Sequence, residues 1–435
     1  MKSQMIPIIR SSDKKSLRRL LVLRGTRLGD AEQVVRPILD DVRRNGDPAL
    51  VRLTQRLDGI DLRRQGFTVG RAEIERAYRR VPKDFLRALE VAAQNIRHIA
   101  ERQLPAAWEI AIAPGVKVGQ IIRPLDRVAC YIPGGRFPLP STVLMSVIPA
   151  QVAGVREIVV TSPHPAPAIL VAADYLKVKT IYRLGGAQAI AAFAFGTRRV
   201  PRADKIVGPG NRYVAAAKKL LSGEVSIDFV AGPTELMVVG DNGRPEWIAA
   251  DLVAQAEHDP EAVALFVTPS RQLALQVQTA TDQVLKRVPP PGQVVARQSL
   301  ERHGAIIVTK DLEEALELAN TFAPEHLTLL GEAMRSVGRI RSAGSIFLGD
   351  WSPVAAGDYA SGSNHILPTA GSARQRGGLS AADFVKVISI QRLRRNGLRQ
   401  LRAAIVSLAK NEGLEAHAHS IEARFNAHGG TAPSD

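Results

Sequence analysis

The feature that most constrains the fold is an alternation of short apolar runs and helical segments between residues 128 and 221. Buried-strand patterns at 128–132, 158–162, 180–184 and 205–207 each lead through a turn into an apolar helical segment. Strand, turn and helix recur four times, and strands joined by helices run parallel within one sheet. The sequence therefore predicts a doubly wound parallel α/β sheet.

Three of the four turns are rich in glycine. They carry Pro-Gly-Gly at 133–135, Gly-Gly at 185–186 and Gly-Pro-Gly-Asn at 208–211. Each would present free backbone N–H groups at a helix N-terminus, which suits a pyrophosphate, although none has the G-x-G-x-x-G spacing of the standard dinucleotide fingerprint. A single turn of this kind is more often a plain tight connection. Three of them at the carboxyl ends of one sheet favour a ligand crevice.

A second alternation of strands and helices follows from residue 236 onward. Strands are expected at 236–239, 262–268 and 305–308, and helices at 245–258, 271–288 and 312–320. Helical periodicity also dominates residues 30–102, where Val34, Ile38 and Val42 recur every four positions. Residues 344–380 form a long irregular stretch, typical of functional segments. Beyond residue 381 we expect two amphipathic helices that dock on another surface, such as a second subunit, and disorder at 429–435.

The net charge of +16 raises the possibility of a nucleic-acid partner. The basic residues are scattered from Arg10 to Arg424, with local concentrations only at 14–27 and 392–402. Aromatic residues, which stack bases in such proteins, make up 5% of the chain. We therefore expect basic solvated faces or a basic proteome, and no nucleic-acid partner. A basic nucleic-acid-binding protein on an enzyme-like scaffold is the alternative from another class.

Neither a membrane partner nor secretion is expected. The longest apolar candidate, 142–155, is interrupted by polar residues and a proline, so it does not predict a membrane span. Basic residues at 14–19 break up any apolar core of a signal peptide. The single cysteine, Cys130, excludes an internal disulfide framework and fits a reducing compartment. We expect a cytoplasmic protein.

Residues 245–258 carry the first candidate ligands. Ile248, Leu252 and Gln255 fall at i, i+4 and i+7 of the expected helix, so Gln255 continues the apolar stripe. His258 lies three residues further, beside Gln255 on the same face of the last turn. An amide oxygen and an imidazole nitrogen at this spacing can share one metal ion. In isolation, such a pair is more often a helix end where the histidine bonds the last carbonyls.

A Glu-His pair begins the extended run at 325–329. Side chains of successive strand residues point to opposite sides, so Glu325 and His326 can meet one ligand only at a strand end, where the chain bends. A lone pair of this kind is usually a surface feature. It becomes a site candidate through partners elsewhere in the chain.

With these segments assembled, the chain resembles the histidinol dehydrogenase family from about residue 30 to residue 425. The matching motifs are YIPGG at 131–135, GGAQAIA at 185–191, VGPGN at 207–211, QAEH at 255–258, APEHL at 323–327, GDY at 357–359 and EGLEAH at 412–417. The resemblance implies two incomplete Rossmann-like doubly wound domains, aldehyde-dehydrogenase-like, with a short N-terminal arm and a small helical C-terminal domain. The implied boundaries are 1–25 for the arm, 26–127 plus 236–378 for the zinc-binding and catalytic domain, 128–235 for the NAD-binding domain and 379–435 for the C-terminal domain.

The family oxidises L-histidinol to L-histidine through L-histidinaldehyde with two NAD, as the last step of histidine biosynthesis. The resemblance implies a homodimer with one zinc ion per subunit, and two imidazoles, a carboxylate and an amide oxygen suit that cation. It assigns His326 as the base for the hydroxyl proton and Glu325 as the activator of water. The zinc ligands carry over to Gln255, His258, Asp358 and, from the partner subunit, His417. The NAD contacts carry over to Tyr131, Gln188 and Asn211, and the substrate contacts to Thr234, His326 and Glu412 besides the zinc ligands.

Two departures from the family pattern bear on the substrate. Thr234 stands where the family usually has serine, which keeps the hydroxyl and adds a methyl group. Val354 stands where the family often has glutamate, which removes a carboxylate. The alternative is a paralogous NAD- and zinc-dependent dehydrogenase of another polar alcohol, for example a sulfonated propanediol. Glu412 and His417 favour histidinol, and no role can be derived for His365 or His419.

Overall fold

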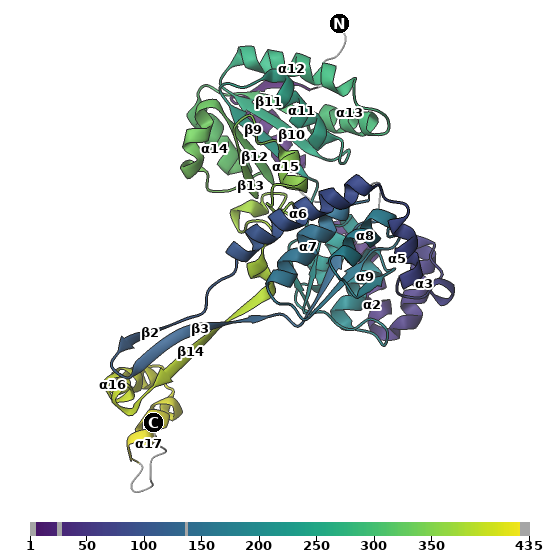
Figure 1. The fold of residues 1–435 in the computed structure, drawn as a ribbon. Coiled ribbons are helices and arrows are strands. Elements are labelled where there is room, and N and C mark those ends of the chain that lie inside the picture. The colour runs from purple at the N-terminus through teal and green to yellow at the C-terminus, as the bar shows by residue number, and fades with distance from the viewer. Residues whose placement is uncertain (1–5, 24–27, 135–137, 427–435) are drawn as a thin grey trace. The chain divides into compact units, whose positions relative to one another are not determined.

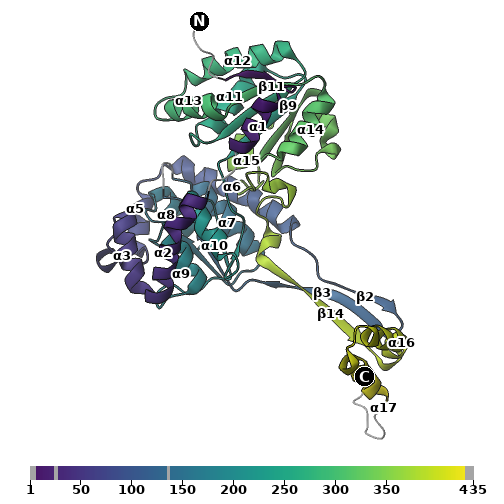
Figure 2. The same ribbon diagram turned by 180° about the vertical axis from the view of Figure 1, so that it is seen from behind.

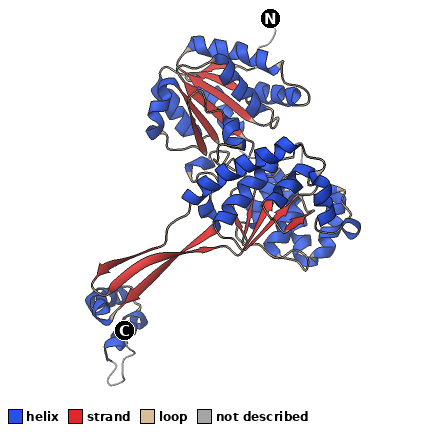
Figure 3. Ribbon diagram, in the orientation of Figure 1, coloured by secondary structure: helices blue, strands red, loops and turns tan. Residues whose placement is uncertain are grey.

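The computed structural model describes residues 6–23, 28–134 and 138–426 of the 435-residue chain. They form two compact units. The larger comprises Met1–Gln103 and Leu125–Phe384, and the smaller comprises Leu104–Pro124 and Val385–Asp435. The expected disorder at 429–435 and parts of the expected N-terminal arm lie outside the described residues. Helices cover two parallel sheets in the larger unit, and the smaller unit holds an antiparallel sheet (Figures 1 and 3).

A five-stranded parallel sheet forms the first half of the larger unit. Its strands are β4 (Arg127–Tyr131), β5 (Glu157–Thr161), β6 (Thr180–Tyr182), β7 (Lys205–Val207) and β8 (Ser226–Ile227). The connecting helices are α7 (Pro140–Val152), α8 (Pro167–Tyr175), α9 (Gly186–Phe195) and α10 (Arg212–Leu221). The strand order β6-β5-β4-β7-β8 reverses direction at β4, which creates a switch point between β4 and β7. The predicted doubly wound sheet is confirmed.

The N-terminal helices cover this five-stranded sheet. They are α2 (Gly29–Asn45), α3 (Asp47–Asp58), α4 (Leu62–Gln65), α5 (Arg71–Tyr78) and α6 (Lys83–Arg102). α2 and α3 share one apolar core with α9 and α10, whose many alanines allow close approach. The expected boundaries had grouped residues 26–127 with residues 236–378, and the packing of α2 and α3 differs from that grouping. Val34 is also 54% exposed, because the buried face of α2 runs through its neighbour Val35.

A six-stranded parallel sheet with the order β1-β11-β10-β9-β12-β13 forms the second half of the larger unit. Its strands are β1 (Ile8–Arg10), β9 (Glu235–Gly240), β10 (Val263–Thr268), β11 (Ala305–Val308), β12 (His326–Leu330) and β13 (Ser345–Leu348). Its helices are α1 (Lys14–Leu23), α11 (Pro245–Ala256), α12 (Arg271–Leu285), α13 (Gly292–His303), α14 (Leu312–Phe322) and α15 (Val354–Tyr359), and 3₁₀ turns cover Gly331–Arg339, Ser372–Arg374 and Ala381–Phe384. α1 and α14 pack on one face, as Figure 2 shows, and α11 and α12 share the core of the other. The expected N-terminal arm thus contributes an edge strand, and α13 and β13 were not predicted.

The smaller unit is a three-stranded antiparallel sheet of order β14-β3-β2 followed by two helices. Its elements are β2 (Trp108–Ala113), β3 (Val116–Pro124), β14 (Val385–Leu393), α16 (Arg395–Asn411) and α17 (Glu415–Asn426). The expectation of helices alone beyond residue 381 was wrong, because residues 385–393 form a strand that pairs antiparallel with β3. None of the helices in the described part of the chain has the length and apolarity that crossing a membrane requires.

Candidate active site

One cavity collects most of the residues that the sequence singled out. It has a volume of about 180 Å³, and loops after β7 and β8 contribute Pro209 and Phe229 to its wall. The carboxyl ends of β7 and β8 therefore face the cavity, and of the three glycine turns only 208–211 contributes a described residue to its lining. The other wall comes from the amino ends of β9 and β12, together with α11 and α15. Six predicted site residues line it: Thr234, Gln255, His258, Glu325, His326 and Asp358.

A chain of hydrogen bonds joins three of these residues. The side-chain amide of Gln255 donates to Thr234 Oγ1 over 2.6 Å, and the Thr234 hydroxyl donates to Glu325 Oε2 over 2.6 Å. The backbone N–H of Glu235 donates to the same carboxylate oxygen over 2.8 Å. The nitrogen end of the Gln255 amide is thereby committed to Thr234, which leaves its oxygen as the end able to bind a cation.

His258 follows helix α11 instead of lying on its last turn. The helix ends at Ala256, and the backbone N–H of His258 reaches the Gln255 carbonyl over 3.4 Å. The expected extension of the helix to His258 was wrong by two residues, because Glu257 is already the C-cap of the helix. His258 and Gln255 nevertheless line the same cavity.

The ring of His326 is buried and held through one nitrogen. Its Nδ1–H donates to the carbonyl of Glu235 on the neighbouring strand β9 over 3.0 Å. Its Nε2 is buried and makes no hydrogen bond among the described residues. Asp358 Oδ1 lies 3.5 Å from this nitrogen, outside good hydrogen-bond geometry. The ring therefore presents an unpaired nitrogen to the cavity.

The side chains of Glu325 and His326 approach each other, although successive residues of a strand point to opposite faces. β12 begins only at His326, after the left-handed Ala323 (φ +53°), and this bend brings Glu325 Oε2 to 3.6 Å from His326 Nδ1. The expectation that the pair could share a ligand only at a bent strand end agrees with this geometry. Both side chains are less than a tenth exposed, so the pair is not a surface feature.

The local charges shift the pKa values of all three acid–base groups. Burial raises the pKa of Glu325 to about 7, against the opposing influence of His326 and the bond from Thr234. Burial lowers the pKa of His326, but the negative charges of Glu325 and Asp358 outweigh it and raise that pKa to about 9. Burial likewise acts to raise the pKa of Asp358, and the nearby charge of His326 holds it below its usual value.

Sequence reasoning assigned no role to His365, which the structure places in the cavity wall. Its Nδ1–H donates to the backbone carbonyl of Asp358 over 2.8 Å, and its Nε2 accepts from the hydroxyl of Thr142 on α7 over 3.1 Å. His365 therefore fixes the backbone that carries Asp358. Its position within the glycine-rich stretch after Gly-Asp-Tyr was the only signal available from the sequence.

The three predicted NAD contacts cluster at the turns of the five-stranded sheet. Tyr131 Oη accepts the backbone N–H of Gly186 over 3.2 Å, and burial raises the pKa of this phenol to about 12. Gln188 is fully buried, and its side-chain oxygen finds no partner in the described residues. Asn211 caps α10 by accepting the N–H groups of Tyr213 and Val214, which leaves its NH₂ group for a ligand.

Glu412 and His417 belong to the smaller unit, where Glu412 ends α16 and His417 lies in α17 with His419. In the described residues no group of three or more His, Cys, Asp and Glu side chains is arranged to hold a metal ion. The larger unit supplies Gln255, His258 and Asp358 of the expected ligand set, and only two of these belong to those residue types.

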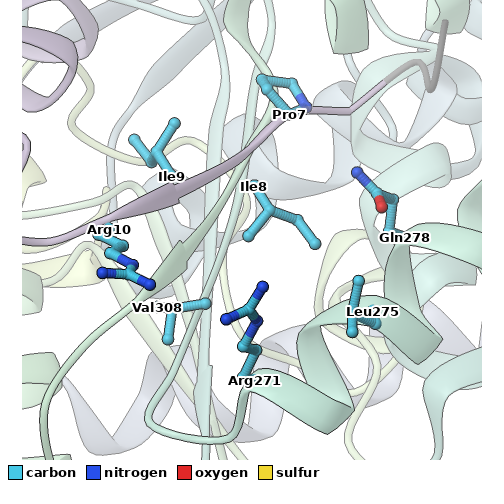
Figure 4. A pocket seen from close by; sticks show the side chains of 8 residues that line it. All are labelled: Pro7, Ile8, Ile9, Arg10, Arg271, Leu275, Gln278 and Val308. Atoms are coloured by element: carbon cyan, nitrogen blue, oxygen red, sulfur yellow. The ribbon is translucent and has the colours of Figure 1, made fainter.

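A larger cavity of about 510 Å³ lies along β1, at the edge of the six-stranded sheet (Figure 4). Ile8 and Leu275 contribute apolar surface, and Arg10 and Arg271 bring guanidinium groups. None of its lining residues is a carboxylate or an imidazole, so it offers no group that could take a proton from an alcohol. The smaller cavity is therefore the candidate active site.

Comparison with known proteins decides the family. The histidinol dehydrogenase family model matches residues 24–425. The chain belongs to the histidinol dehydrogenase family. It is 48% identical to the histidinol dehydrogenase of Methanothermobacter thermautotrophicus over 407 residues. The aligned region covers 91% of this chain and 94% of that enzyme. The enzyme of Halalkalibacterium halodurans is 47% identical and covers 96% and 99%.

A solved structure agrees with this assignment. The crystal structure of histidinol dehydrogenase from Elizabethkingia anophelis superposes with a TM-score of 0.91 at 35% identity, covering 98% of this chain and 99% of that one. The chain is therefore an enzyme, an oxidoreductase of histidine biosynthesis, and the family implies histidinol as its substrate.

Proposed function

We propose that this enzyme oxidises L-histidinol to L-histidine through L-histidinaldehyde, using zinc and two molecules of NAD. The observation that carries the proposal is the buried ring of His326. Its unpaired Nε2 faces a cavity that also contains a second ionisable group, Glu325, and the candidate cation ligands Gln255, His258 and Asp358. A base, a water activator and an electrophile site in one enclosed space suit oxidation of an alcohol to an acid.

The residues of the cavity fit zinc. The oxygen end of the Gln255 amide, the imidazole of His258 and the carboxylate of Asp358 are ligands that this cation accepts. The charge of His258 also acts on the carboxylate of Asp358, which supports their proximity. We propose that His417 of the partner subunit completes the set. Zinc held there would supply a cation that could bind the substrate and offset the charge of Asp358.

His326 is proposed to take the hydroxyl proton through Nε2. Its Nδ1–H is held by the Glu235 carbonyl, so the neutral ring carries its lone pair on Nε2. Asp358 is one of the charges that raise the pKa of His326. A cation on that carboxylate would reduce this influence and favour the neutral ring, which is the form that acts as a base. NAD, when bound, would supply the hydride acceptor while Nε2 of His326 takes the proton.

Glu325 is proposed to add water to the aldehyde. The only cysteine, Cys130, is fully buried in β4, and burial raises the pKa of its thiol to about 12. A thioester route to the acid is therefore closed to this chain, and the second oxidation requires a hydrated aldehyde. The Glu325 carboxylate, held by Thr234 and with a pKa of about 7, accepts one proton of the water as the water oxygen bonds to the carbonyl carbon. The carbonyl π bond breaks, and its oxygen takes the proton that His326 accepted in the first oxidation, which gives the diol. His326 can then accept a hydroxyl proton of the diol, while a second NAD, when bound, would supply the hydride acceptor.

NAD is proposed to bind at the glycine turns of the five-stranded sheet. The unpaired buried oxygen of Gln188 fits a hydroxyl or amide donor of the cofactor. Tyr131 ends β4 and Asn211 follows β7, so both lie further along the same sheet. Gly208, with φ +110°, allows close approach of a phosphate, because a side chain there would meet the Tyr131 carbonyl at 2.1 Å.

A homodimer is proposed from the smaller unit considered by itself. Large apolar side chains of its sheet and helices are exposed, among them Trp108, Ile110, Ile112, Val387 and Leu408. An exposed apolar surface of this kind is typical of a protein–protein interface. Burying it on a second copy would bring the unit that carries Glu412 and His417 to the partner. A cytoplasmic location, without nucleic-acid or membrane partners, remains part of the proposal.

The structure weakens one argument for another alcohol as substrate. Val354 is 5% exposed and belongs to the apolar core that includes Phe347. The cavity is not lined by this residue, so the missing carboxylate changes no group in its wall. Thr234 keeps the hydroxyl that joins Gln255 to Glu325.

The test is turnover by the purified, zinc-loaded protein with L-histidinol and NAD. We expect two NADH for each histidine formed, and no turnover with a sulfonated propanediol. Glu325→Gln should form the aldehyde and stall there, whereas His326→Ala should impair both oxidations. Sustained oxidation of the propanediol with none of histidinol, or wild-type histidine formation by Glu325→Gln, would contradict the proposal.

A further inference from the structure

A carboxylate outside the predicted site lies at the Gly185–Gly186 turn. Asp58, the last residue of α3, accepts the side-chain N–H of Gln188 at its Oδ2 over 2.8 Å. Gly59 ends the helix in the left-handed conformation, and the ring of His164 donates to the backbone carbonyl of Asp58 over 2.8 Å. The half-buried Asp58 is thus held through two contacts, one at its carboxylate and one at its backbone carbonyl.

The bond from Gln188 to Asp58 orients a buried amide toward a ligand. With its nitrogen committed to Asp58, the amide of the fully buried Gln188 turns its oxygen to Gly186, where a built Cβ would stand 2.6 Å from that oxygen. The same oxygen has no hydrogen-bond partner among the described residues. Since buried acceptors are rarely left unpaired, this one fits the O–H or N–H of a bound molecule.

The strand order indicates which end of a dinucleotide meets this turn. The active-site cavity touches Pro209 and Phe229, which follow β7 and β8 on one side of the sheet, whereas the Gly185–Gly186 turn follows β6 at the opposite edge. β6 and β7 are separated by β5 and β4, which is about 14 Å at a spacing of ~4.8 Å per strand. With the nicotinamide at the cavity, the adenosine half falls at Asp58 and Gln188.

The carboxylate at this turn is negative, and its nearest cationic influence in the described residues is the ring of His164. No Arg or Lys side chain forms an ion pair with Asp58 in the described ranges, and the pKa of Asp58 is raised by its burial, with the charge of His164 opposing. A carboxylate in this setting accepts a ribose hydroxyl and repels a phosphate on the same ribose, whereas sites that accept the phosphate present an arginine.

We propose that Asp58 is the residue through which this enzyme selects NAD over NADP. Its carboxylate accepts the 2′-hydroxyl of the adenine ribose and disfavours the 2′-phosphate, while it holds the Gln188 amide in its binding orientation. The inference rests on the proposed use of NAD at this sheet and adds the residue that sets the choice between the two cofactors. A sequence scan misses it, because the acidic residue precedes the whole sheet instead of following the glycine turn by about 20 residues.

The test measures dissociation constants of NAD and NADP by calorimetry, without alcohol substrate, for the full-length protein and its variants. The wild type should bind NAD at least about 100-fold more tightly than NADP. Asp58→Asn, which keeps the shape and removes the charge, should reduce this ratio at least tenfold, chiefly by tightening NADP. Asp58→Ser provides the same comparison should the amide variant fold poorly. Gln188→Ala should weaken both cofactors and leave the ratio unchanged.

Asp61→Asn is the matched control. Asp61 lies three residues from Asp58, and its replacement by asparagine removes the same charge. The side chain of Asp61 caps α4, and asparagine can make the same capping bonds. Its ratio should equal that of the wild type. If the Asp58 variants bind NAD but keep the wild-type ratio, or if Asp61→Asn shifts it equally, the assignment of Asp58 is overturned and the proposed function stands. A wild type that binds neither dinucleotide overturns both.

Discussion

Replacing Asp228 by asparagine should strongly destabilise the turn that carries Asn211. Asp228 and Lys218 form an ion pair in which the side chains are 1% and 2% exposed. Asp228 also accepts the N–H groups of Gly208 and Phe229, each over 2.7 Å, and Lys218 donates to the Gly208 carbonyl over 3.0 Å. The pair therefore holds both backbone groups of Gly208 at the end of β7.

The expected magnitude follows from burial. Removing one member of a buried pair leaves the other charge uncompensated and costs about 3–5 kcal/mol. For a folding unit of this size, that cost lowers the melting temperature on the order of 10 °C. Replacing both residues, Lys218→Met with Asp228→Asn, removes the charges together and should cost less than about 2 kcal/mol. The two single changes are thus expected to be non-additive.

Thermal and urea unfolding of the four proteins in this cycle, with NAD titration of each, would measure the effect. Glu332→Gln is the control, because it breaks an ion pair between exposed side chains: Glu332 is 59% exposed and Arg335 is 81% exposed. This substitution should change the free energy of unfolding by less than about 0.5 kcal/mol. If Asp228→Asn costs no more than this control, or if the double variant costs the sum of the singles, the pair does not hold the turn. A folded Asp228→Asn variant with unchanged NAD affinity would refute the link to cofactor binding.

Three further predictions follow from single residues. Burial raises the pKa of Asp251 to about 6, so ionisation of its carboxyl group opposes folding, and the stability present below about pH 4 is lost as pH rises through 6. In urea titrations at pH 8, Asp251→Asn should be more stable than the wild type by about 1–2 kcal/mol. This gain must vanish at about pH 4. The buried Cys130 thiol, with a pKa of about 12, should resist thiol reagents in the native protein and react only in urea; rapid native labelling would contradict its burial. Gly208→Ala should weaken NAD binding at least tenfold in calorimetry, because φ is +110° and the new Cβ meets the Tyr131 carbonyl, and unchanged affinity would show that the turn relaxes.

The fold could be predicted from the sequence where the spacing of apolar residues within a short segment decides between strand and helix. Residues 128–221 alternate buried strands with apolar helices, and both patterns recur within a few residues of each other. β14 shows the opposite case: its partner β3 lies more than 250 residues away in sequence, and much of its surface is exposed. Its sequence, in which Val387 and Ile388 are adjacent, also lacks the regular period of a strand, so the adjoining helical pattern of α16 was extended over it.

Within helices, spacing predicted the element more reliably than its buried face. The repeat of Val34, Ile38 and Val42 advances by four residues, which drifts around a helix of 3.6 residues per turn. Ile38 and Val42 are buried as predicted, but Val35 takes the place of Val34 on the packed face, because mixed steps of three and four stay on one side. Propensity alone could not choose between adjacent valines, since only the packing against α9 and α10 does so.

In the candidate site, too, the sequence predicted what local motifs contain and missed what distant segments contribute. Residue types in motifs predicted the donors Gln255, His258 and Asp358, but the groups that adjust them come from segments distant in sequence. The carbonyl of Glu235 fixes which nitrogen of His326 is free, and Asp358 raises the pKa of that ring. Asp58 and the Lys218–Asp228 pair belong to no recognised motif, because each acts through a backbone or amide group that folding brings to it. A motif can therefore specify which chemistry a site contains, whereas the protonation state and cofactor choice depend on contacts between segments far apart in the chain.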